Sequence, residues 1–215
     1  DTLGSKSTAI GVGALESQNP ASATDMYNTA VGYTAGLSVT TGLQNTLIGG
    51  LAGGAFTDAD LNVALGMQAL QRDTLGSKTT AIGHSTLANQ NFTSATDSFN
   101  VAVGYQAGIS VTTGVQNVIV GGLAGDDLTD ADYNVAIGNQ ALSSDTLGSR
   151  SVAIGAGALA AQNFTSATDT YNTAVGYTAG LSVTTGTNNT LIGGSAGDAI
   201  TTGYSNVALG VNAAG

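Results

Sequence analysis

Hydrophobic and polar positions recur along this chain in a fixed pattern. A short motif, roughly Asn-[Thr/Val]-Ala-[Ile/Val/Leu]-Gly-x-x-Ala, occurs twelve times, and its glycines follow one another at intervals of 21, 17, 17 and 17 residues. Within the motif the side-chain types alternate with a period of two, which is the period of a β-strand and not of a helix. The pattern therefore predicts twelve short strands. The motif glycines are Gly11, Gly32, Gly49, Gly66, Gly83, Gly104, Gly121, Gly138, Gly155, Gly176, Gly193 and Gly210.

A longer repeat contains the short one. The sequence Asp-Thr-Leu-Gly-Ser begins at Asp1, Asp73 and Asp145, so the chain consists of blocks 1–72, 73–144 and 145–215, each with four motifs. Self-similarity at a fixed period is the signature of a solenoid, in which each repeat stacks on the next. We therefore expect a single all-β repeat domain over 1–215, a parallel β-solenoid of about twelve coils. At the usual strand spacing the rod would be roughly 55–60 Å long.

Two apolar columns follow from this stacking. An aliphatic residue precedes every motif glycine, from Ile10 to Leu209, and we expect this column to face the interior. On the opposite strand face lies an alanine column, with larger residues at Leu47, Ile119 and Leu191. Each coil would bury only two or three aliphatic groups, which is little against the entropy cost of folding. We expect the alanine column and its larger members to form a second apolar surface through which chains associate side by side.

Asparagine precedes the strand in nine of the twelve coils. This residue type accepts left-handed backbone geometry, and stacked asparagines can hydrogen-bond to one another along a solenoid. We therefore predict an asparagine ladder, with each motif glycine at the bend that ends its strand. The asparagines are Asn28, Asn45, Asn62, Asn100, Asn117, Asn134, Asn172, Asn189 and Asn206.

Composition and charge exclude several function classes. Hydrophobic residues make up 42% of the chain and charged residues 8%, which is too apolar for disorder, and the 32 glycines lack the period of collagen. The formal net charge of −10, with only four cations, argues against nucleic acid as a partner. Neither a run of 18 apolar residues nor a signal peptide is visible, so we expect no membrane insertion in this segment.

The sequence contains few of the residue types that usually act in catalysis. The chain has no cysteine, so it can form no Cys-His arrangement, and its one histidine (His84) and one glutamate (Glu16) leave few residues for a catalytic triad or a carboxylate pair. His84 occupies a variable position after a motif glycine, where we expect a surface residue. We predict that the protein is not an enzyme.

The four extra residues in every fourth coil fall in segments 18–25, 90–97 and 162–169. Insertions in solenoids map to loops on one face, which is often the binding face. One hypothesis is that these loops form a ladder of contact sites with exposed phenylalanines. The interpretation that we favour for the rings is that each phenylalanine packs over an adjacent coil as a structural plug. The candidate contact residues are Asn19, Pro20, Asn91, Phe92, Thr93, Asn163, Phe164 and Thr165.

Acidic residues two apart form a second candidate site. Asp58 with Asp60, and Asp130 with Asp132, could offer oxygen ligands to Ca²⁺. The glycine and the closing glutamate of an EF-hand loop are missing, and the third block lacks the pair. We therefore favour turn caps over a metal site, and we expect no cofactor.

The segments Ser-Val-Ala-Ile-Gly at 151–155 and Ser-Thr-Ala-Ile-Gly at 7–11 resemble the head repeats of YadA-like trimeric autotransporter adhesins. The form Asn-Thr-Ala-Val-Gly-Tyr-Thr-Ala-Gly, at 28–36 and 172–180, is similar to repeats of phage tail fibres. The resemblance implies a left-handed β-roll that winds as a homotrimer, intertwined or side by side. It also implies an extracellular fibre on a cell surface or virion that attaches to a host-cell or environmental surface, with glycans among the ligands. The coils are longer than the family's repeat, which leaves adhesin and phage fibre equally open.

Two other functions remain open at this stage. Threonine stands nine residues before the motif glycine in nine coils, as at Thr40, Thr57 and Thr112, and such a hydroxyl column could bind ice. The column lapses at Ala23, Ala95 and Ala167, beside the long loops. The chain could also be a purely mechanical spacer of a fibre.

Overall fold

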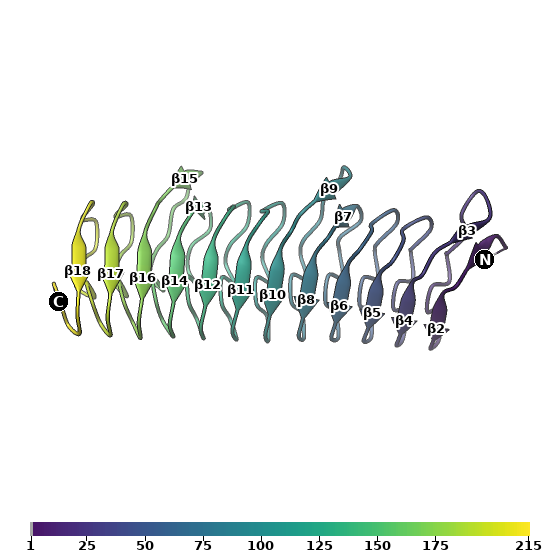
Figure 1. The fold of residues 1–215 in the computed structure, drawn as a ribbon, viewed down its shortest axis with the longest axis horizontal. Helices are drawn as coiled ribbons and strands as arrows, with labels where there is room; N and C mark the ends of the chain where they lie inside the picture. The colour runs from purple at the N-terminus through teal and green to yellow at the C-terminus, as the bar shows by residue number, and fades with distance from the viewer. Residues whose placement is uncertain (1) are drawn as a thin grey trace.

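The computed structural model of the protein describes residues 2–215 and shows an elongated rod of stacked coils (Figure 1). Asp1, where the sequence repeat begins, lies outside the described residues. Twelve three-residue strands form one continuous sheet along the rod, and no helix occurs in the described chain. The strands of this sheet are β2 (Thr8–Ile10), β4 (Thr29–Val31), β5 (Thr46–Ile48), β6 (Val63–Leu65), β8 (Thr80–Ile82), β10 (Val101–Val103), β11 (Val118–Val120), β12 (Val135–Ile137), β14 (Val152–Ile154), β16 (Thr173–Val175), β17 (Thr190–Ile192) and β18 (Val207–Leu209).

Strand pairing follows the sequence repeat. Every pair in the long sheet is parallel, and Val101 in β10 lies between Thr80 and Val118, its equivalents 21 residues before and 17 residues after. The same register holds from β2 to β18. The predicted all-β parallel solenoid of about twelve coils is therefore confirmed.

Three further two-stranded sheets occur where the long coils leave the rod. Each joins a short strand to the coil that follows it, as Gly148 pairs with Thr168. Their strands are β1 (Gly4–Ser5) with β3 (Thr24–Asp25), β7 (Gly76–Ser77) with β9 (Thr96–Asp97), and β13 (Gly148–Ser149) with β15 (Thr168–Asp169).

The strand face that points into the rod is the opposite of the one expected from the aliphatic column. The middle residue of each strand points inward, so Ala30, Leu47 and Ile119 are fully buried. The aliphatic residue before the glycine points outward, and Ile10, Leu65 and Ile192 are 59%, 40% and 38% exposed. The expected inward stack is therefore wrong, and Leu47, Ile119 and Leu191 belong to the core and not to a second surface.

Packing in a narrow coil explains this orientation. The opposite wall already supplies larger side chains, such as Leu15, Phe56 and Leu70, so the strand contributes mostly alanine. Where the strand contributes a leucine, the opposite wall has glycine: a Cβ on Gly36 or Gly53 would lie 2.7 or 2.8 Å from the Leu47 side chain. Large residues thus alternate between the two walls, as close packing requires.

The asparagine ladder is present as predicted. The backbone N–H of Asn134 donates to Oδ1 of Asn117 at 2.9 Å, and Nδ2 of Asn117 donates to the Ala131 carbonyl at 2.7 Å. Both asparagines are fully buried. Each side chain therefore joins its own coil to the next one.

The motif glycines end the strands, also as predicted. Gly104 has a φ of +138°, and a Cβ there would lie 2.5 Å from the carbonyl oxygen of Gly121 in the next coil. No L-residue fits both the backbone angle and the distance. Glycine at this position thus permits the close stacking of successive bends.

Candidate functional site

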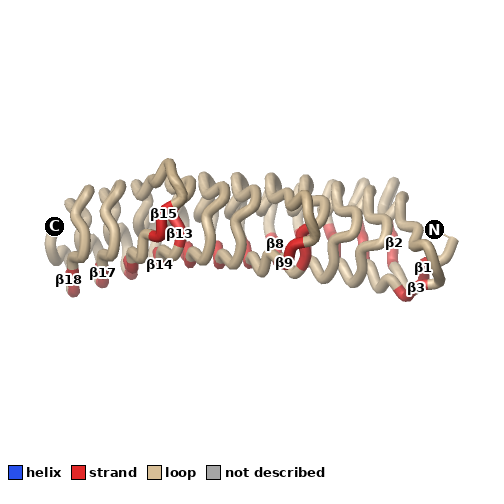
Figure 2. Tube along the Cα trace, turned by 90° about the horizontal axis from the view of Figure 1, so that it is seen from above, coloured by secondary structure: helices blue, strands red, loops and turns tan. Residues whose placement is uncertain are grey.

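The three long loops project from one edge of the rod and are the candidate contact sites (Figures 1 and 2). Each loop is held against the preceding coil by one of the two-residue parallel sheets, β1–β3, β7–β9 or β13–β15. The tips, residues 21–23, 93–95 and 165–167, are exposed. The loops are therefore fixed at their bases and open to a partner at their tips.

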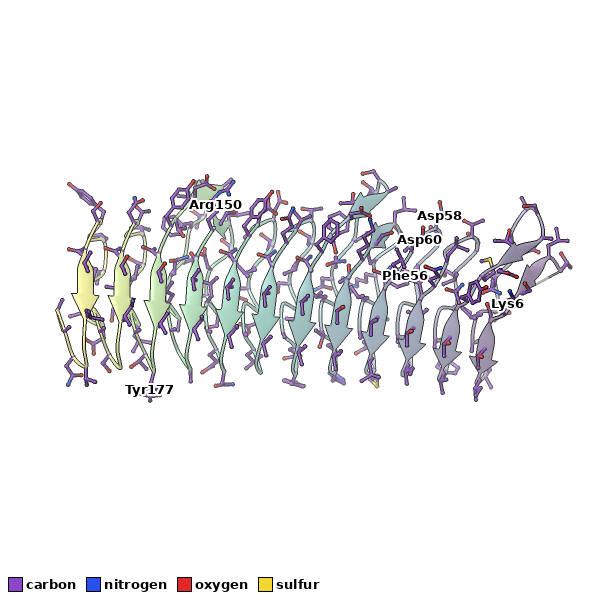
Figure 3. The ribbon with its side chains drawn as sticks, in the orientation of Figure 1. Lys6, Phe56, Asp58, Asp60, Arg150 and Tyr177 are labelled. Atoms are coloured by element: carbon purple, nitrogen blue, oxygen red, sulfur yellow. The ribbon has the colours of Figure 1, made fainter. Side chains whose placement is uncertain are left out.

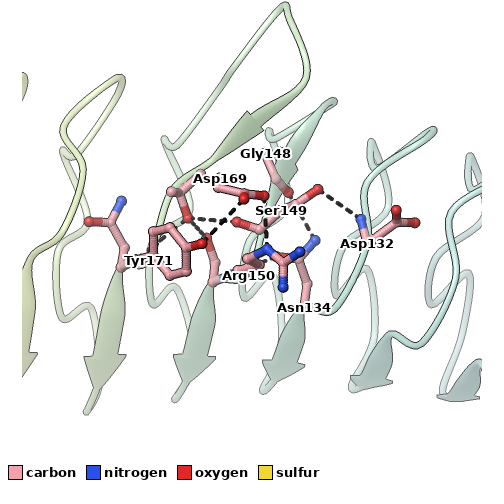
Figure 4. A network of polar contacts seen from close by, with 10 residues as sticks. Asp132, Asn134, Gly148, Ser149, Arg150, Asp169 and Tyr171 are labelled. Carbon is pink, nitrogen blue, oxygen red and sulfur yellow. Dashed lines mark hydrogen bonds and ion pairs between the residues drawn. The ribbon is translucent and has the colours of Figure 1, made fainter.

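An ion pair closes the base of each long loop. Arg150 Nε lies 2.9 Å from Oδ1 of Asp169 (Figure 4), and Lys6 Nζ lies 2.6 Å from Oδ2 of Asp25. The hydrogen bond that Lys6 donates to Asp25 raises the pKa of Lys6 and lowers that of Asp25, and the hydrogen bond that Arg150 donates to Asp169 likewise raises the pKa of Arg150. Lys78 pairs with Asp97 in the middle block. Three of the four cations of the chain are thus paired with loop aspartates and do not form a free basic patch.

Aromatic rings accompany these ion pairs. Lys6 Nζ lies 5.1 Å from the ring centre of Tyr27, and the guanidinium carbon of Arg150 lies 4.6 Å from that of Tyr133. Tyr171 donates its hydroxyl to Asp169 at 3.2 Å, as Figure 4 shows. These cation–π contacts and hydrogen bonds fix the loop edge as a repeated arrangement of cation, carboxylate and ring.

Phe92 and Phe164 are not exposed. They are 5% and 8% exposed, so the hypothesis of exposed rings is wrong and the favoured interpretation, a ring packed over an adjacent coil, is confirmed. A Cβ on Gly76 would lie 2.8 Å from Cδ2 of Phe92, which shows the ring packed over the preceding coil. Burial of an aromatic ring in the loop base stabilises the loop more than exposure would, because a large apolar area leaves water. Pro20, at the equivalent place in the first loop, is also buried.

The remaining candidate loop residues lie at the surface. Asn19, Asn91 and Asn163 are exposed, and each accepts a hydrogen bond from the threonine 17 residues earlier, at 3.0 Å for Thr74 and Asn91. Thr93 and Thr165 are exposed at the loop tips. Of the predicted contact residues, the structure therefore leaves the asparagines and threonines accessible and removes the phenylalanines and Pro20.

The sequence pattern did not predict the buried polar cluster that lies beneath the second and the third long loop. Asp73 is fully buried and accepts hydrogen bonds from the N–H groups of Gly76 and Phe92, at 3.0 and 3.1 Å, and from Nε2 of Gln90 at 2.7 Å. Oε1 of Gln90 in turn accepts from Nδ2 of Asn100 at 2.9 Å. The signal was present: a glutamine stands ten residues before the asparagine only in the long coils.

The acidic pairs act as turn caps. Oδ1 of Asp60 accepts the N–H of Leu43 at 2.7 Å, and Oδ1 of Asp58 accepts the hydroxyl of Thr41 at 2.6 Å. Asp130 and Asp132 make the equivalent bonds one block later. Burial raises the pKa of Asp60, and the hydrogen bond from Leu43 opposes this rise. Figure 3 shows Asp58 and Asp60 at the loop edge, and within residues 2–215 no three acidic or histidine side chains gather around one point.

Comparison of the chain with protein-family models, curated proteins and solved structures gives no significant match. In the described part of the chain, no helix has the length and apolar character needed to span a bilayer.

Proposed function

We propose that this chain is a structural and adhesive segment of an extracellular homotrimeric fibre, of the surface-adhesin or phage-fibre type. The observation that carries the proposal is the exposed apolar face of the twelve-stranded sheet. The likeness of its motifs to YadA-like head repeats supports the same assignment, together with the left-handed winding and the trimeric state that this likeness implies. We place no catalytic role in it.

The outer face of the sheet consists of two columns. One contains the aliphatic residues before the motif glycines, and the other contains threonine or valine two residues earlier, such as Val101 and Val118. Most side chains of the two columns are half-buried, and in the middle of the rod Leu65 and Val101 are the most open, at 40% and 37% exposed. Contiguous apolar patches of this kind mark interaction sites in soluble proteins. The face also has no charged residue within its strands, so a second copy could pack on it without burying a charge.

This surface replaces the one expected from the sequence. Side-by-side association was predicted through the alanine column with Leu47, Ile119 and Leu191, all of which are interior. The outward aliphatic column now takes that role in the proposal. A twelve-strand face, repeated identically along the rod, offers the same contact to each of three chains.

The ice-binding alternative has less support from the threonine column. The hydroxyl of Thr57 donates to the Thr74 carbonyl at 3.1 Å, and Thr129 donates to the Thr146 carbonyl at 2.9 Å. These hydroxyls are half-buried and bind the rod's own backbone. Thermal hysteresis of a micromolar solution would support ice binding. If no thermal hysteresis is measured, the fibre proposal and the spacer alternative are left.

The native mass tests assembly. Multi-angle light scattering of the purified protein should give three times the chain mass of 20.9 kDa. Placing two lysines on the outer face, Val103→Lys with Ile137→Lys, should give the single-chain mass, whereas Thr93→Lys at a loop tip should leave the trimer intact. A single-chain mass for the unsubstituted protein at tens of micromolar would refute the trimer.

Adhesion needs a separate test. Fluorescently labelled rods would be incubated with a panel of bacterial and animal cells, alongside a variant in which each long loop is replaced by the turn of a 17-residue coil. Loss of retention in the shortened variant is expected if the tips make the contact. Equal retention would exclude the loops as the contact site, and retention by no surface would favour the spacer.

A further inference from the structure

A hollow of about 270 Å³ lies on the rod edge opposite the long loops. It spans three successive coils, the last of the second block and the first two of the third, and Figure 3 shows Tyr177 at this lower edge, away from Arg150. The floor consists of small residues, Ala156, Gly157 and Ala160. The walls consist of Asn139 and Gln140 on one side and of Tyr177, Thr178 and Leu181 on the other.

The lining combines an aromatic platform with amides. Tyr177 is 70% exposed, so much of its side chain is open to solvent. Asn139 and Gln140 are exposed on the facing wall, and Nδ2 of Asn139 donates to the Gly122 carbonyl at 2.9 Å, which fixes the orientation of that amide. Side-chain amides can both donate and accept hydrogen bonds. An aromatic ring facing such groups suits a ligand that has an apolar face and a rim of hydroxyls.

Charge narrows the ligand class. None of the eight lining residues is charged, and the chain as a whole has a formal charge of −10. A carboxylated or sulfated sugar would therefore meet no cation in the hollow and would be repelled at long range. The volume is slightly below the range usual for drug-sized ligands and matches a single sugar ring.

The chain itself contains a closed version of the same site. In the second block, 72 residues earlier, His84 stands in place of Ala156 and Tyr105 in place of Tyr177. The two rings stack with centroids 5.6 Å apart and planes 20° from parallel. The histidine therefore covers the tyrosine, and Ala88 beneath it is buried, whereas its equivalent Ala160 is half-buried. The hollow at Tyr177 therefore lacks the histidine that covers Tyr105, and its facing wall has Asn139 where the earlier place has Met67.

We propose that this hollow binds one neutral hexose unit of a surface glycan, with the sugar's C–H face on Tyr177 and its hydroxyls on Asn139 and Gln140. The proposal rests on the adhesive function proposed above and gives that function a ligand class and a second contact edge. It differs from the loop-tip contact in its residues, its edge of the rod and its occurrence in one block.

Saturation-transfer NMR on the intact protein tests the proposal. The probes are the methyl glycosides of glucose, galactose, mannose and N-acetylglucosamine, with a methyl sialoside as the anionic probe. At least one neutral glycoside should receive saturation on its ring protons, with a dissociation constant on the order of 1–10 mM, as the affinity per atom of so small a ligand allows.

Three variants locate the site. Ala156→His copies the closed site of the second block and should weaken binding at least about tenfold, and Tyr177→Ala should do the same because it removes the aromatic anchor. Tyr33→Ala, the matched change in the first block, should leave binding unchanged. Tyr33 and Tyr177 are both exposed, and Ala156 lies at the surface, so far-UV circular dichroism should show all three variants folded.

Several results would overturn the inference. These are the absence of saturation on every neutral glycoside at 10-fold the expected dissociation constant, stronger binding of the sialoside, or equal weakening by Tyr33→Ala. An unchanged affinity in Ala156→His and Tyr177→Ala would also overturn it. These results are independent of the fibre proposal, because trimeric, adhesive rods with an inert hollow would refute the sugar site alone. Single-chain rods that bind a methyl glycoside through Tyr177 would refute the trimer and support the site.

Discussion

The asparagine ladder predicts a large loss of stability from one buried side chain. The change is Asn117→Ala, in the seventh coil, where the side chain has coils packed on both sides. Nδ2 of Asn117 donates to the Ala131 carbonyl at 2.7 Å, and its Oδ1 accepts the N–H of Asn134 at 2.9 Å. Ala131 and Asn134 are fully buried, so alanine leaves one carbonyl and one N–H without these partners in the interior.

The expected magnitude follows from the cost of two unsatisfied buried groups. Each lost partner costs about 1–3 kcal/mol, so the free energy of unfolding should fall by about 2–6 kcal/mol. Gln116→Ala is the matched control. Gln116 is the neighbouring residue, its side chain is exposed, and its φ of +57° is as accessible to alanine as to glutamine, so a change within about 0.5 kcal/mol is expected.

Urea unfolding followed by circular dichroism measures the difference. Because solenoid stability is a sum over coils and their nearest-neighbour contacts, part of the loss can appear as local opening. Hydrogen exchange of the Asn134 amide therefore accompanies the urea experiment, and we expect its protection to fall in Asn117→Ala only. Equal stability of the two variants, with an unchanged Asn134 exchange rate, would refute the claim that the ladder holds the coils together.

Three other changes test other parts of the architecture. Gly104→Ala should lower the unfolding free energy by more than about 3 kcal/mol or prevent folding, because its Cβ would lie 2.5 Å from the Gly121 carbonyl oxygen. Gly194→Ala, with no atom within 4 Å of its Cβ, should change the unfolding free energy by less than about 0.5 kcal/mol. Thermal melts that rank the two variants equally would contradict this. Phe92→Ala should lower the unfolding free energy by about 3–5 kcal/mol, since the ring is buried, and Phe99→Ala should lower it far less because the Phe99 ring is exposed. The opposite order in urea unfolding would contradict the packed position of Phe92. Burial raises the pKa of Asp126, so this carboxyl group holds its proton more tightly in the folded protein than in the unfolded chain. The stability linked to that proton is complete below pH ~4. It is lost as the pH rises through the pKa of Asp126 in the folded protein. Asp126→Asn should therefore stabilise the protein at pH 7, by less than about 1 kcal/mol, and not at pH 3, and a stabilisation that is equal at both pH values would contradict this assignment.

The repeat was sufficient to predict the solenoid, because stacking constrains equivalent residues directly. A register of 21 or 17 residues stacks each residue on its equivalent in the next coil. The asparagine ladder and the glycine bends could therefore be inferred from residues such as Asn117 and Gly104 with no knowledge of the coil's shape. The face that points inward could not be inferred in this way. Period two states that Ala102 and Val103 lie on opposite faces, but only the opposite wall of the coil determines which of them has room inside.

The candidate sites depended on contacts across coils, which spacing alone does not reveal. Phe92 lies in a polar, inserted loop, and its burial requires both Gly76 in the coil before it and the N–H bond to Asp73. The hollow at Tyr177 is a similar case. The small side chain of Ala156 leaves Tyr177 uncovered there, and this contrast becomes visible only when His84 is seen stacked on Tyr105.

The four-coil period has its origin in the interior, and this explains how the surface can vary. The interior position seven residues after the motif glycine cycles through glutamine, valine, a larger apolar residue and aspartate, as in Gln90, Val111, Leu128 and Asp145. The aspartate and the next glutamine lie beneath the long loop and hydrogen-bond to each other, with 2.5 Å between Gln162 Nε2 and Asp145 Oδ2. Because this pair occurs once in four coils, a long loop leaves the rod only once in four coils. The loop spacing is thus set by buried hydrogen bonds, at roughly 19 Å for four strand spacings. The outward position after the glycine keeps tyrosine and glycine in the second and third coils of each block but varies in the first coil, where Val12, His84 and Ala156 stand, so histidine and alanine exchange there between blocks. A fibre built in this way can keep its length and its loop spacing while the proposed sugar site opens in one block and closes in another.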